Sequence, residues 1–178
     1  MKPFLSKSPA ETERFAAEFS KKLKKGDVIA LCGDLGSGKT TFVRGLFAGL
    51  NGNPAYFVTS PTFTLLHEYS TKKSPLYHFD LYRIETFAEF QNIDFGEYFD
   101  GNGICLVEWG DKIPELEPEF DYKVQFEICH DTTRQIVIFG KPREALGKPP
   151  LSKRGKGGVC RCSRLFNSPS PLFSRGGS

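Results

Sequence analysis

The sequence has no apolar run of the roughly 18 residues that a membrane-spanning helix requires. Residues 1–7 also lack an apolar core of the length found in secretory signal peptides. These two absences argue against the membrane and secreted classes of protein. We therefore expect a cytoplasmic protein that has no membrane partner.

The chain is also poor in cysteine patterns that would indicate a disulfide framework or a metal site. Cys32, Cys105 and Cys129 each lie in an apolar, strand-like run, which favours buried thiols over disulfides in a reducing compartment. Cys160 and Cys162 have no second cysteine pair and no nearby histidine. We therefore predict no metal site at this pair.

The formal net charge of +3 averages two segments of unlike composition. Residues 141–178 hold nine Lys and Arg against one acidic residue, whereas residues 1–140 hold 15 basic and 20 acidic residues. We therefore expect one acidic folded domain over residues 1–140 and a disordered basic tail over residues 141–178. The basic isoelectric point is then no evidence for a nucleic-acid surface on the domain, although a nucleic-acid-binding role of the tail stays open.

The most informative stretch is residues 33–40, Gly-Asp-Leu-Gly-Ser-Gly-Lys-Thr, which fits the phosphate-loop pattern G-x-x-x-x-G-K-[ST]. A β-branched apolar run precedes it, and residues 41–50 follow with apolar side chains at helical spacing. Glycines allow backbone N–H groups to turn around phosphate oxygens, and the helix N-terminus adds partial positive charge. We expect Lys39 to reach the β- and γ-phosphates of a nucleotide and Thr40 to ligate Mg²⁺.

Other elements follow from apolar periodicity and turn residues. Ser8 and Glu11 form a capping box that begins a helix, and Phe15, Phe19 and Leu23 line one face of that helix. The pattern predicts an α/β protein of the three-layer P-loop NTPase class, with a mixed, mainly parallel central sheet and an antiparallel C-terminal hairpin. Strands are expected over residues 28–32, 57–59, 63–69, 76–82, 103–108, 122–128 and 135–139, and further helices over residues 41–50 and 86–99.

Two acidic residues end apolar strands and are candidates for the chemistry of nucleotide hydrolysis. Asp80 follows residues 76–79 and Glu108 follows residues 104–107. In an open α/β sheet the C-terminal ends of the strands form the edge where ligands bind. Either acid can ligate Mg²⁺ or orient the attacking water, and the residues alone leave this choice open.

Three further residues near these acids have both a functional and a structural interpretation. Thr62 lies in a Ser-Pro-Thr turn and is a candidate switch residue for the γ-phosphate or Mg²⁺. Trp109, the only tryptophan, follows Glu108 and can either seal the pocket or pack in the core. His78 is expected to be a packed strand residue rather than a catalytic base.

Four segments together resemble the TsaE family in order and spacing. They are Gly-Asp-Leu-Gly-Ser-Gly-Lys-Thr-Thr-Phe at 33–42, Ser-Pro-Thr-Phe-Thr-Leu at 60–65, Tyr-His-Phe-Asp-Leu-Tyr-Arg at 77–83 and Val-Glu-Trp at 107–109. The resemblance covers roughly residues 6–140. It implies a compact α/β ATPase that uses ATP and Mg²⁺ and supports the TsaD–TsaB threonylcarbamoyl transferase, which modifies the tRNA adenosine beside the anticodon. Contact with tRNA is then expected to be mainly indirect.

The resemblance also implies roles for individual residues. Lys39, Thr62, Asp80 and Glu108 are the catalytic candidates, and Thr40, Glu108 and Asp80 are the candidates for metal binding. Thr12, in the first helix, matches a family position near the adenine. The expected nucleotide-binding residues are Thr12, Asp34, Leu35, Gly36, Ser37, Gly38, Lys39, Thr40, Thr41 and Trp109.

Two other function classes share the phosphate-loop pattern. A guanine-nucleotide switch protein usually has Asn-Lys-x-Asp for the base, and no asparagine here precedes a lysine. A small-molecule kinase needs several arginines to clamp the transferred phosphate, and residues 1–140 contain only Arg14, Arg44, Arg83 and Arg134, far apart in the sequence. Competition between ATP and GTP, and a search for a phosphorylated product, distinguish these alternatives.

Overall fold

The computed structural model describes residues 2–93 and 95–140. The predicted basic tail over residues 141–178 lies outside the described residues, so its predicted disorder stays a prediction. Within the described ranges, no helix is both long enough and apolar enough to cross a membrane.

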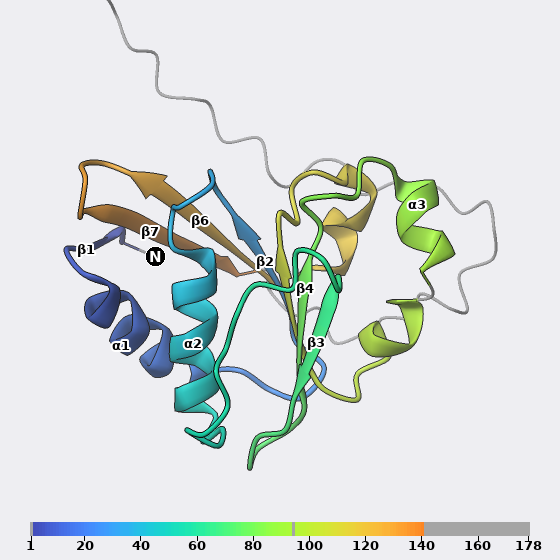
Figure 1. The fold of residues 1–178 in the computed structure, drawn as a ribbon, viewed down its shortest axis with the longest axis horizontal. Helices are drawn as coiled ribbons and strands as arrows, with labels where there is room; N and C mark the ends of the chain where they lie inside the picture. Colours follow the sequence, from blue (N-terminus) through green and yellow to red (C-terminus); the bar gives the residue numbers. More distant parts are fainter. Residues whose placement is uncertain (1, 94, 141–178) are drawn as a thin grey trace, which may run out of the picture.

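Seven strands form one mixed sheet in the order β1-β7-β6-β2-β5-β4-β3 (Figure 1). β2 pairs in parallel with β5 and β6, and β4 pairs in parallel with β5. The β1–β7, β3–β4 and β6–β7 pairs are antiparallel. The strands are β1 Phe4–Ser6, β2 Val28–Cys32, β3 Leu66–Tyr69, β4 Leu76–Asp80, β5 Ile104–Glu108, β6 Tyr122–Ile128 and β7 Arg134–Gly140.

The prediction of a mainly parallel sheet is wrong, because parallel pairs make up only half of the pairings and occupy the centre. Short turns join β3 to β4 and β6 to β7, and short turns can only connect antiparallel strands. The predicted antiparallel C-terminal hairpin is present as β6 and β7.

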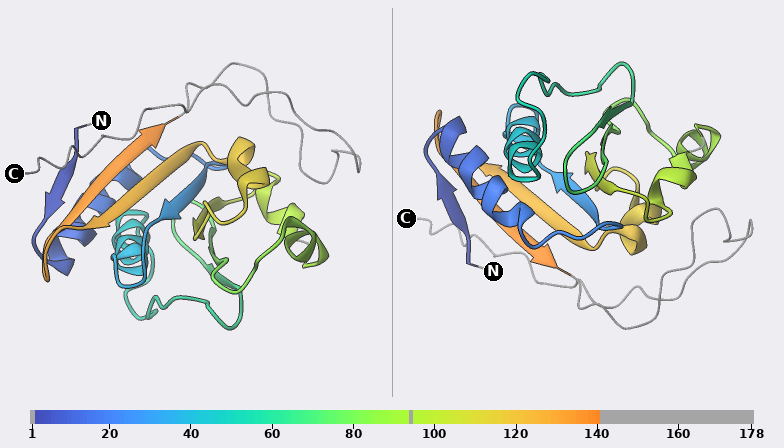
Figure 2. Two further views of the ribbon diagram at one scale, coloured as in Figure 1. Left: turned by 90° about the horizontal axis from the view of Figure 1, so that it is seen from above. Right: turned by 90° about the horizontal axis from the view of Figure 1, so that it is seen from below.

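The long helices are α1 (Pro9–Ser20) and α2 (Lys39–Gly49), which lie side by side, while α3 (Phe87–Asn92) lies at the opposite side of the molecule (Figures 1 and 2). Two short 3₁₀ turns, η1 (Phe95–Phe99) and η2 (Pro114–Glu119), complete the regular structure. The predicted start of α1 is confirmed, because the Glu11 amide donates to the Ser8 hydroxyl at 3.3 Å.

Three predicted elements differ from the structure. Residues 57–59 form no strand, since the Val58 carbonyl accepts a hydrogen bond from the Arg44 side chain instead of from a neighbouring strand. The strand expected over residues 63–69 begins only at Leu66, because Leu65 has a left-handed backbone with φ of 66°. The helix expected over residues 86–99 is divided into α3 and η1, and Gly96 in this stretch disfavours a continuous helix.

Alternating side chains of the central strands enter two separate hydrophobic cores. Ile29 and Leu31 of β2 pack with α1 and α2, whereas Val28, Ala30 and Cys32 pack with side chains of α3 and η2. This alternation follows from the two-residue period of a strand whose faces are both covered. The sheet therefore lies between two helical layers, and each side chain at its C-terminal edge points to one layer or to the other.

Close approach of α1 and α2 depends on small residues between them. A Cβ atom added to Gly45 would lie 2.2 Å from the Glu13 carbonyl oxygen and 2.6 Å from the Glu13 Cα. Gly49 faces Ala17 and Ser20 in the same way. From Gly45 to Gly49 in α2, the facing residues in α1 change from Glu13 to Ala17 and Ser20. The residue numbers rise in the same direction, so the two helices run parallel and their N-terminal ends lie at the same end of the layer.

We predict that Gly45→Ala destabilises the protein, because the clash is with the backbone of α1 and cannot be relieved by a rotamer change. Overpacking of this kind costs about 1–3 kcal/mol, and the gain in helix propensity of about 1 kcal/mol offsets only part of it. Chemical denaturation measures the change. Ala48→Gly, at an exposed position of α2, gives the propensity effect alone, and a Gly45→Ala protein as stable as wild type would contradict the close packing.

Candidate functional site

A glycine-rich loop, residues 33–38, connects β2 to α2 at the C-terminal edge of the sheet. Gly33, Gly36 and Gly38 have φ angles of 145°, 75° and 103°, which residues with a Cβ rarely adopt. A Cβ on Gly33 would also lie 2.6 Å from the Phe126 carbonyl oxygen. The three glycines therefore allow the backbone conformation of this turn, which leads directly into the first turn of α2.

Lys39, the first residue of α2, is only 5% exposed and turns back over the loop. Its Nζ donates to the carbonyl oxygens of Gly33 at 2.7 Å and Asp34 at 2.9 Å, and lies 3.8 Å from the centre of the Trp109 ring. Burial lowers the pKa of the Lys39 ammonium, while nearby carboxylates, Glu108 first among them, oppose that shift. The protein thus holds a cation at the loop with replaceable carbonyl partners.

Asp80 and Glu108 are direct neighbours on the adjacent parallel strands β4 and β5. Both are almost fully buried, at 2% and 3% exposure. The Thr40 hydroxyl of α2 donates to Glu108 Oε1 at 2.8 Å, and His78 Nε2 lies 2.9 Å from the same oxygen. The strand-end acids predicted from the sequence therefore lie beside the start of α2.

Asp80 links this pair to the loop that contains Thr62. The hydroxyls of Ser60 and Thr62 both donate to Asp80 Oδ2, the latter at 2.6 Å, and the Tyr82 amide donates to Asp80 Oδ1 at 2.9 Å. Ser60 and Thr62 also lie 3.0 Å apart through their hydroxyl oxygens. A change in the position of this loop is therefore coupled to the Asp80 carboxylate.

The structure brings six predicted residues into one connected cluster through the contacts above. They are Lys39, Thr40, Thr62, Asp80, Glu108 and Trp109. The remaining loop residues Asp34, Leu35, Gly36, Ser37 and Gly38 form the turn, and Thr41 continues α2. Leu35 is 77% exposed at the loop tip. The Ser37 hydroxyl is buried and has no hydrogen-bond partner among the described residues.

Thr12 lies apart from this cluster. It is buried in α1, and its hydroxyl lies 2.8 Å from the Ser6 hydroxyl. Because α1 and α2 run parallel, Thr12 lies at the same end of the helical layer as the glycine-rich loop. The expected role of Thr12 near an adenine stays a prediction.

The sequence interpretation missed two residues of this region. His78 was expected only to pack, and it does pack, but its ring also contacts Glu108. The signal was present in the spacing, because residues two apart in a strand face the same side, and His78 precedes Asp80 by two. Arg134, distant in the sequence, donates to the Gly36 carbonyl at 3.3 Å from the start of β7, which only the tertiary structure reveals.

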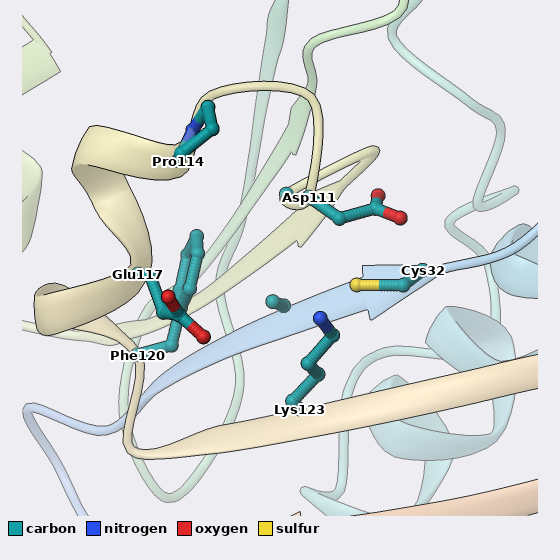
Figure 3. Close-up of a pocket in the computed structure, with 8 residues that line it drawn as sticks. Cys32, Asp111, Pro114, Glu117, Phe120 and Lys123 are labelled. Atoms are coloured by element: carbon teal, nitrogen blue, oxygen red, sulfur yellow. The ribbon is translucent and has the colours of Figure 1, made fainter. Parts of the chain in front are cut away.

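A separate cavity of about 110 Å³ lies on the opposite face of the sheet, and none of the predicted site residues lines it (Figure 3). The side chains of Cys32 and Lys123 point into it, with Asp111 and Glu117 nearby. Burial, reinforced by Asp111, raises the pKa of the Cys32 thiol to about 12. A protonated thiol is a poor nucleophile, so this cavity offers no reactive cysteine.

Taken together, the fold and the site define a mixed α/β protein with a glycine-rich loop between a buried strand and a helix, and with paired strand-end carboxylates beside that loop. A family model described as "Threonylcarbamoyl adenosine biosynthesis protein TsaE" matches residues 6–136. The chain belongs to this family. The resemblance inferred from four sequence segments is thereby confirmed.

Individual relatives agree with the family assignment. The tRNA threonylcarbamoyladenosine biosynthesis protein TsaE of Bacillus subtilis is 43% identical over 131 residues, which cover 74% of this chain and 80% of the relative. The protein of the same name from Treponema pallidum is 36% identical over 134 residues, which cover 75% of this chain and 97% of the relative. The crystal structure of Bacillus subtilis YdiB superposes with a TM-score of 0.63 at 33% identity and covers 78% of this chain and 84% of that one.

The three described cysteines differ in their expected reactivity. Cys129 was expected to be buried, but it lies just beyond the end of β6 and is exposed, whereas Cys32 and Cys105 are buried. Burial also raises the pKa of the Cys105 thiol. The interpretation of Cys129 as a core residue is wrong because the apolar run continues past Ile128 into the hairpin turn.

We predict that iodoacetamide at mildly alkaline pH alkylates Cys129 and leaves Cys32 and Cys105 unmodified. The reagent requires an accessible thiolate, which burial and the raised pKa deny to the two strand cysteines. Peptide mapping by mass spectrometry measures the labelling at each position. Denatured protein, in which all three react, is the control, and equal labelling of Cys32 and Cys129 in the native protein would refute the prediction.

Proposed function

We propose that this chain is a Mg²⁺-dependent ATPase of the P-loop NTPase class that supports formation of threonylcarbamoyladenosine in tRNA. The observation that carries the proposal is the cluster at the sheet edge, where the buried Lys39 and the Thr40–Glu108 hydrogen bond adjoin the glycine-rich loop. The role in tRNA modification is inferred from membership of the TsaE family. We further propose that residues 1–140 form the ATPase domain and that it acts in the cytoplasm.

The loop supplies what a triphosphate needs. Lys39 exchanges its two carbonyl contacts for phosphate oxygens, which are stronger acceptors for an ammonium group. Backbone N–H groups at the start of α2 add partial positive charge. Asp34 to Thr41 thus form the proposed phosphate cradle, with Trp109 packed beside Lys39.

The residues present fit Mg²⁺ better than a metal held entirely by protein. Among the described residues no group of three or more His, Cys, Asp and Glu side chains forms a metal site. Mg²⁺ is usually bound by one or two carboxylates together with substrate phosphates and water. Thr40, Glu108 and Asp80 are the proposed ligands. When bound, the ion neutralises charge that develops on the phosphate oxygens.

Asp80, Ser60 and Thr62 can link hydrolysis to a change of conformation. Both hydroxyls donate to the Asp80 carboxylate. The orientation of this carboxylate, and of any water molecule bound to it, therefore depends on the position of the loop that contains Ser60 and Thr62. Loops that respond to the γ-phosphate are a common switching device in nucleotide hydrolases. We propose that Thr62 reports nucleotide state in this way, and that Asp80 and Glu108 divide the tasks of water orientation and metal binding.

We propose that the partner whose state is changed is the TsaD–TsaB transferase, and that contact with tRNA is mainly indirect. The acidic balance of residues 1–140 supports this, because it provides no overall attraction for a phosphate backbone. The alternatives of a guanine-nucleotide switch and a small-molecule kinase lack specific support, although Arg134 does reach the loop. Nucleotide competition and product analysis remain their tests.

We predict that Lys39→Ala weakens ATP binding by roughly 10- to 100-fold without unfolding the domain. Charge-assisted hydrogen bonds contribute about 1.5–3 kcal/mol, and about 1.4 kcal/mol corresponds to a factor of ten. Calorimetric titration with ATP measures the affinity, and thermal unfolding checks the fold. Lys21→Ala, at an exposed lysine paired with Glu18 in α1, is the control that keeps wild-type affinity. An unchanged affinity in Lys39→Ala would remove this lysine from the nucleotide site.

The proposed function is tested by multi-turnover formation of threonylcarbamoyladenosine by TsaD and TsaB. We expect product to accumulate over many cycles when this chain and ATP are present, and to stop after few cycles without them. The Lys39→Ala variant is the matched inactive control, since its fold is expected to be intact. Equal yields with and without this chain would count decisively against the proposal.

A further inference from the structure

His78 is the one buried histidine of the site, and the proposed mechanism does not yet use it. It lies in the middle of β4, is 0% exposed and contacts Glu108 Oε1 through Nε2 at 2.9 Å. Its other ring nitrogen, Nδ1, is buried and has no hydrogen-bond partner among the described residues. A polar ring is therefore kept in the interior although only one of its two nitrogens is satisfied.

An apolar residue at this position would avoid the unsatisfied nitrogen. Leu76, on the same face of β4, shows that this face accepts one. Leaving a buried polar atom without a partner is unfavourable, so the contact with Glu108 is the interaction that the imidazole provides here. Because a carboxylate oxygen only accepts hydrogen bonds, we assign the ring hydrogen to Nε2, so that Nε2–H donates a hydrogen bond to Oε1.

Two donors converge on this single oxygen, and they come from different elements, α2 and β4. Thr40 donates to Oε1 from α2, but Thr40 is also a proposed ligand of Mg²⁺. A hydroxyl that ligates a cation through a lone pair can still donate its hydrogen, so the Thr40 contact depends on the position of the ion, whereas His78 holds Oε1 from the sheet itself. The second carboxylate oxygen, Oε2, receives no hydrogen bond from the described residues, so it is available to the ion.

We propose that His78 is a positioning residue that fixes the Glu108 carboxylate for Mg²⁺ through the Nε2–H to Oε1 hydrogen bond. This inference rests on the proposed function, because it assumes that Glu108 binds the ion. Groups behind a metal ligand commonly orient it, and their loss typically lowers metal affinity by roughly 10- to 100-fold. His78 touches neither the phosphates nor the reacting water, so its effect passes through Glu108.

Two amide substitutions separate hydrogen bonding from packing. The amide nitrogen of Gln reaches the position of His Nε2, whereas that of the shorter Asn reaches only the position of Nδ1. Both side chains are polar and smaller than or similar to histidine, so both variants are expected to fold. We therefore expect His78→Gln to restore what His78→Asn removes.

The experiment measures apparent Mg²⁺ affinity by calorimetry in the presence of a non-hydrolysable ATP analogue. We expect His78→Asn to weaken it by about 10- to 100-fold and His78→Gln to stay within about threefold of wild type. Binding of the analogue without Mg²⁺ stays unchanged in both, which a general loss of structure would not allow. His67→Asn is the matched control, because His67 pairs with His78 in register but contacts Tyr69 instead of Glu108.

A second arm uses Glu108→Gln as the background. If His78 acts through Glu108, His78→Asn has little further effect in that background, because the carboxylate that it orients is already gone. Wild-type Mg²⁺ affinity in His78→Asn, or equal losses in the Asn and Gln variants, would overturn the inference and leave the proposed function standing. Absence of any Mg²⁺ effect on nucleotide binding by the wild-type protein would overturn both.

Discussion

The carboxylate of Glu108 joins the three elements on which the site depends. It ends β5, accepts from Thr40 of α2, 68 residues away in the sequence, and contacts His78 of β4, 30 residues away. A buried carboxylate is costly unless it is hydrogen-bonded, so these partners must be present for the sheet edge to be stable. The same requirement keeps Thr40, at the start of α2, beside the acids.

Lys39 shows how a buried ammonium group is stabilised by neutral partners. Its ammonium is buried against the Trp109 ring and satisfied by two carbonyls of its own loop. Because these partners are neutral, an anion can replace them with a net electrostatic gain. The loop thus wraps around its lysine through contacts that all lie within the loop or with Trp109.

The strand period divides the chemistry of the molecule between two faces. His78, Asp80 and Glu108 face α2, whereas the cavity beside Cys32 lies on the face covered by η2. Trp109 is placed at the border between them by a left-handed backbone with φ of 61° directly after β5. The cavity beside Cys32 therefore lies apart from the cluster of Lys39, Thr40, Asp80 and Glu108.

The sequence by itself determined the glycine-rich loop, the capped start of α1, the buried central strands and the two strand-end acids. These features depend on local backbone conformation and on apolar periodicity, and both can be read from a short stretch of sequence without knowledge of the residues that pack against it. Only the tertiary structure decided the order of the strands in the sheet, that residues 57–59 stay outside it, and that Arg134 reaches the glycine-rich loop. Pairing register and hydrogen bonds between distant residues depend on how the elements pack, and no local pattern contains that information.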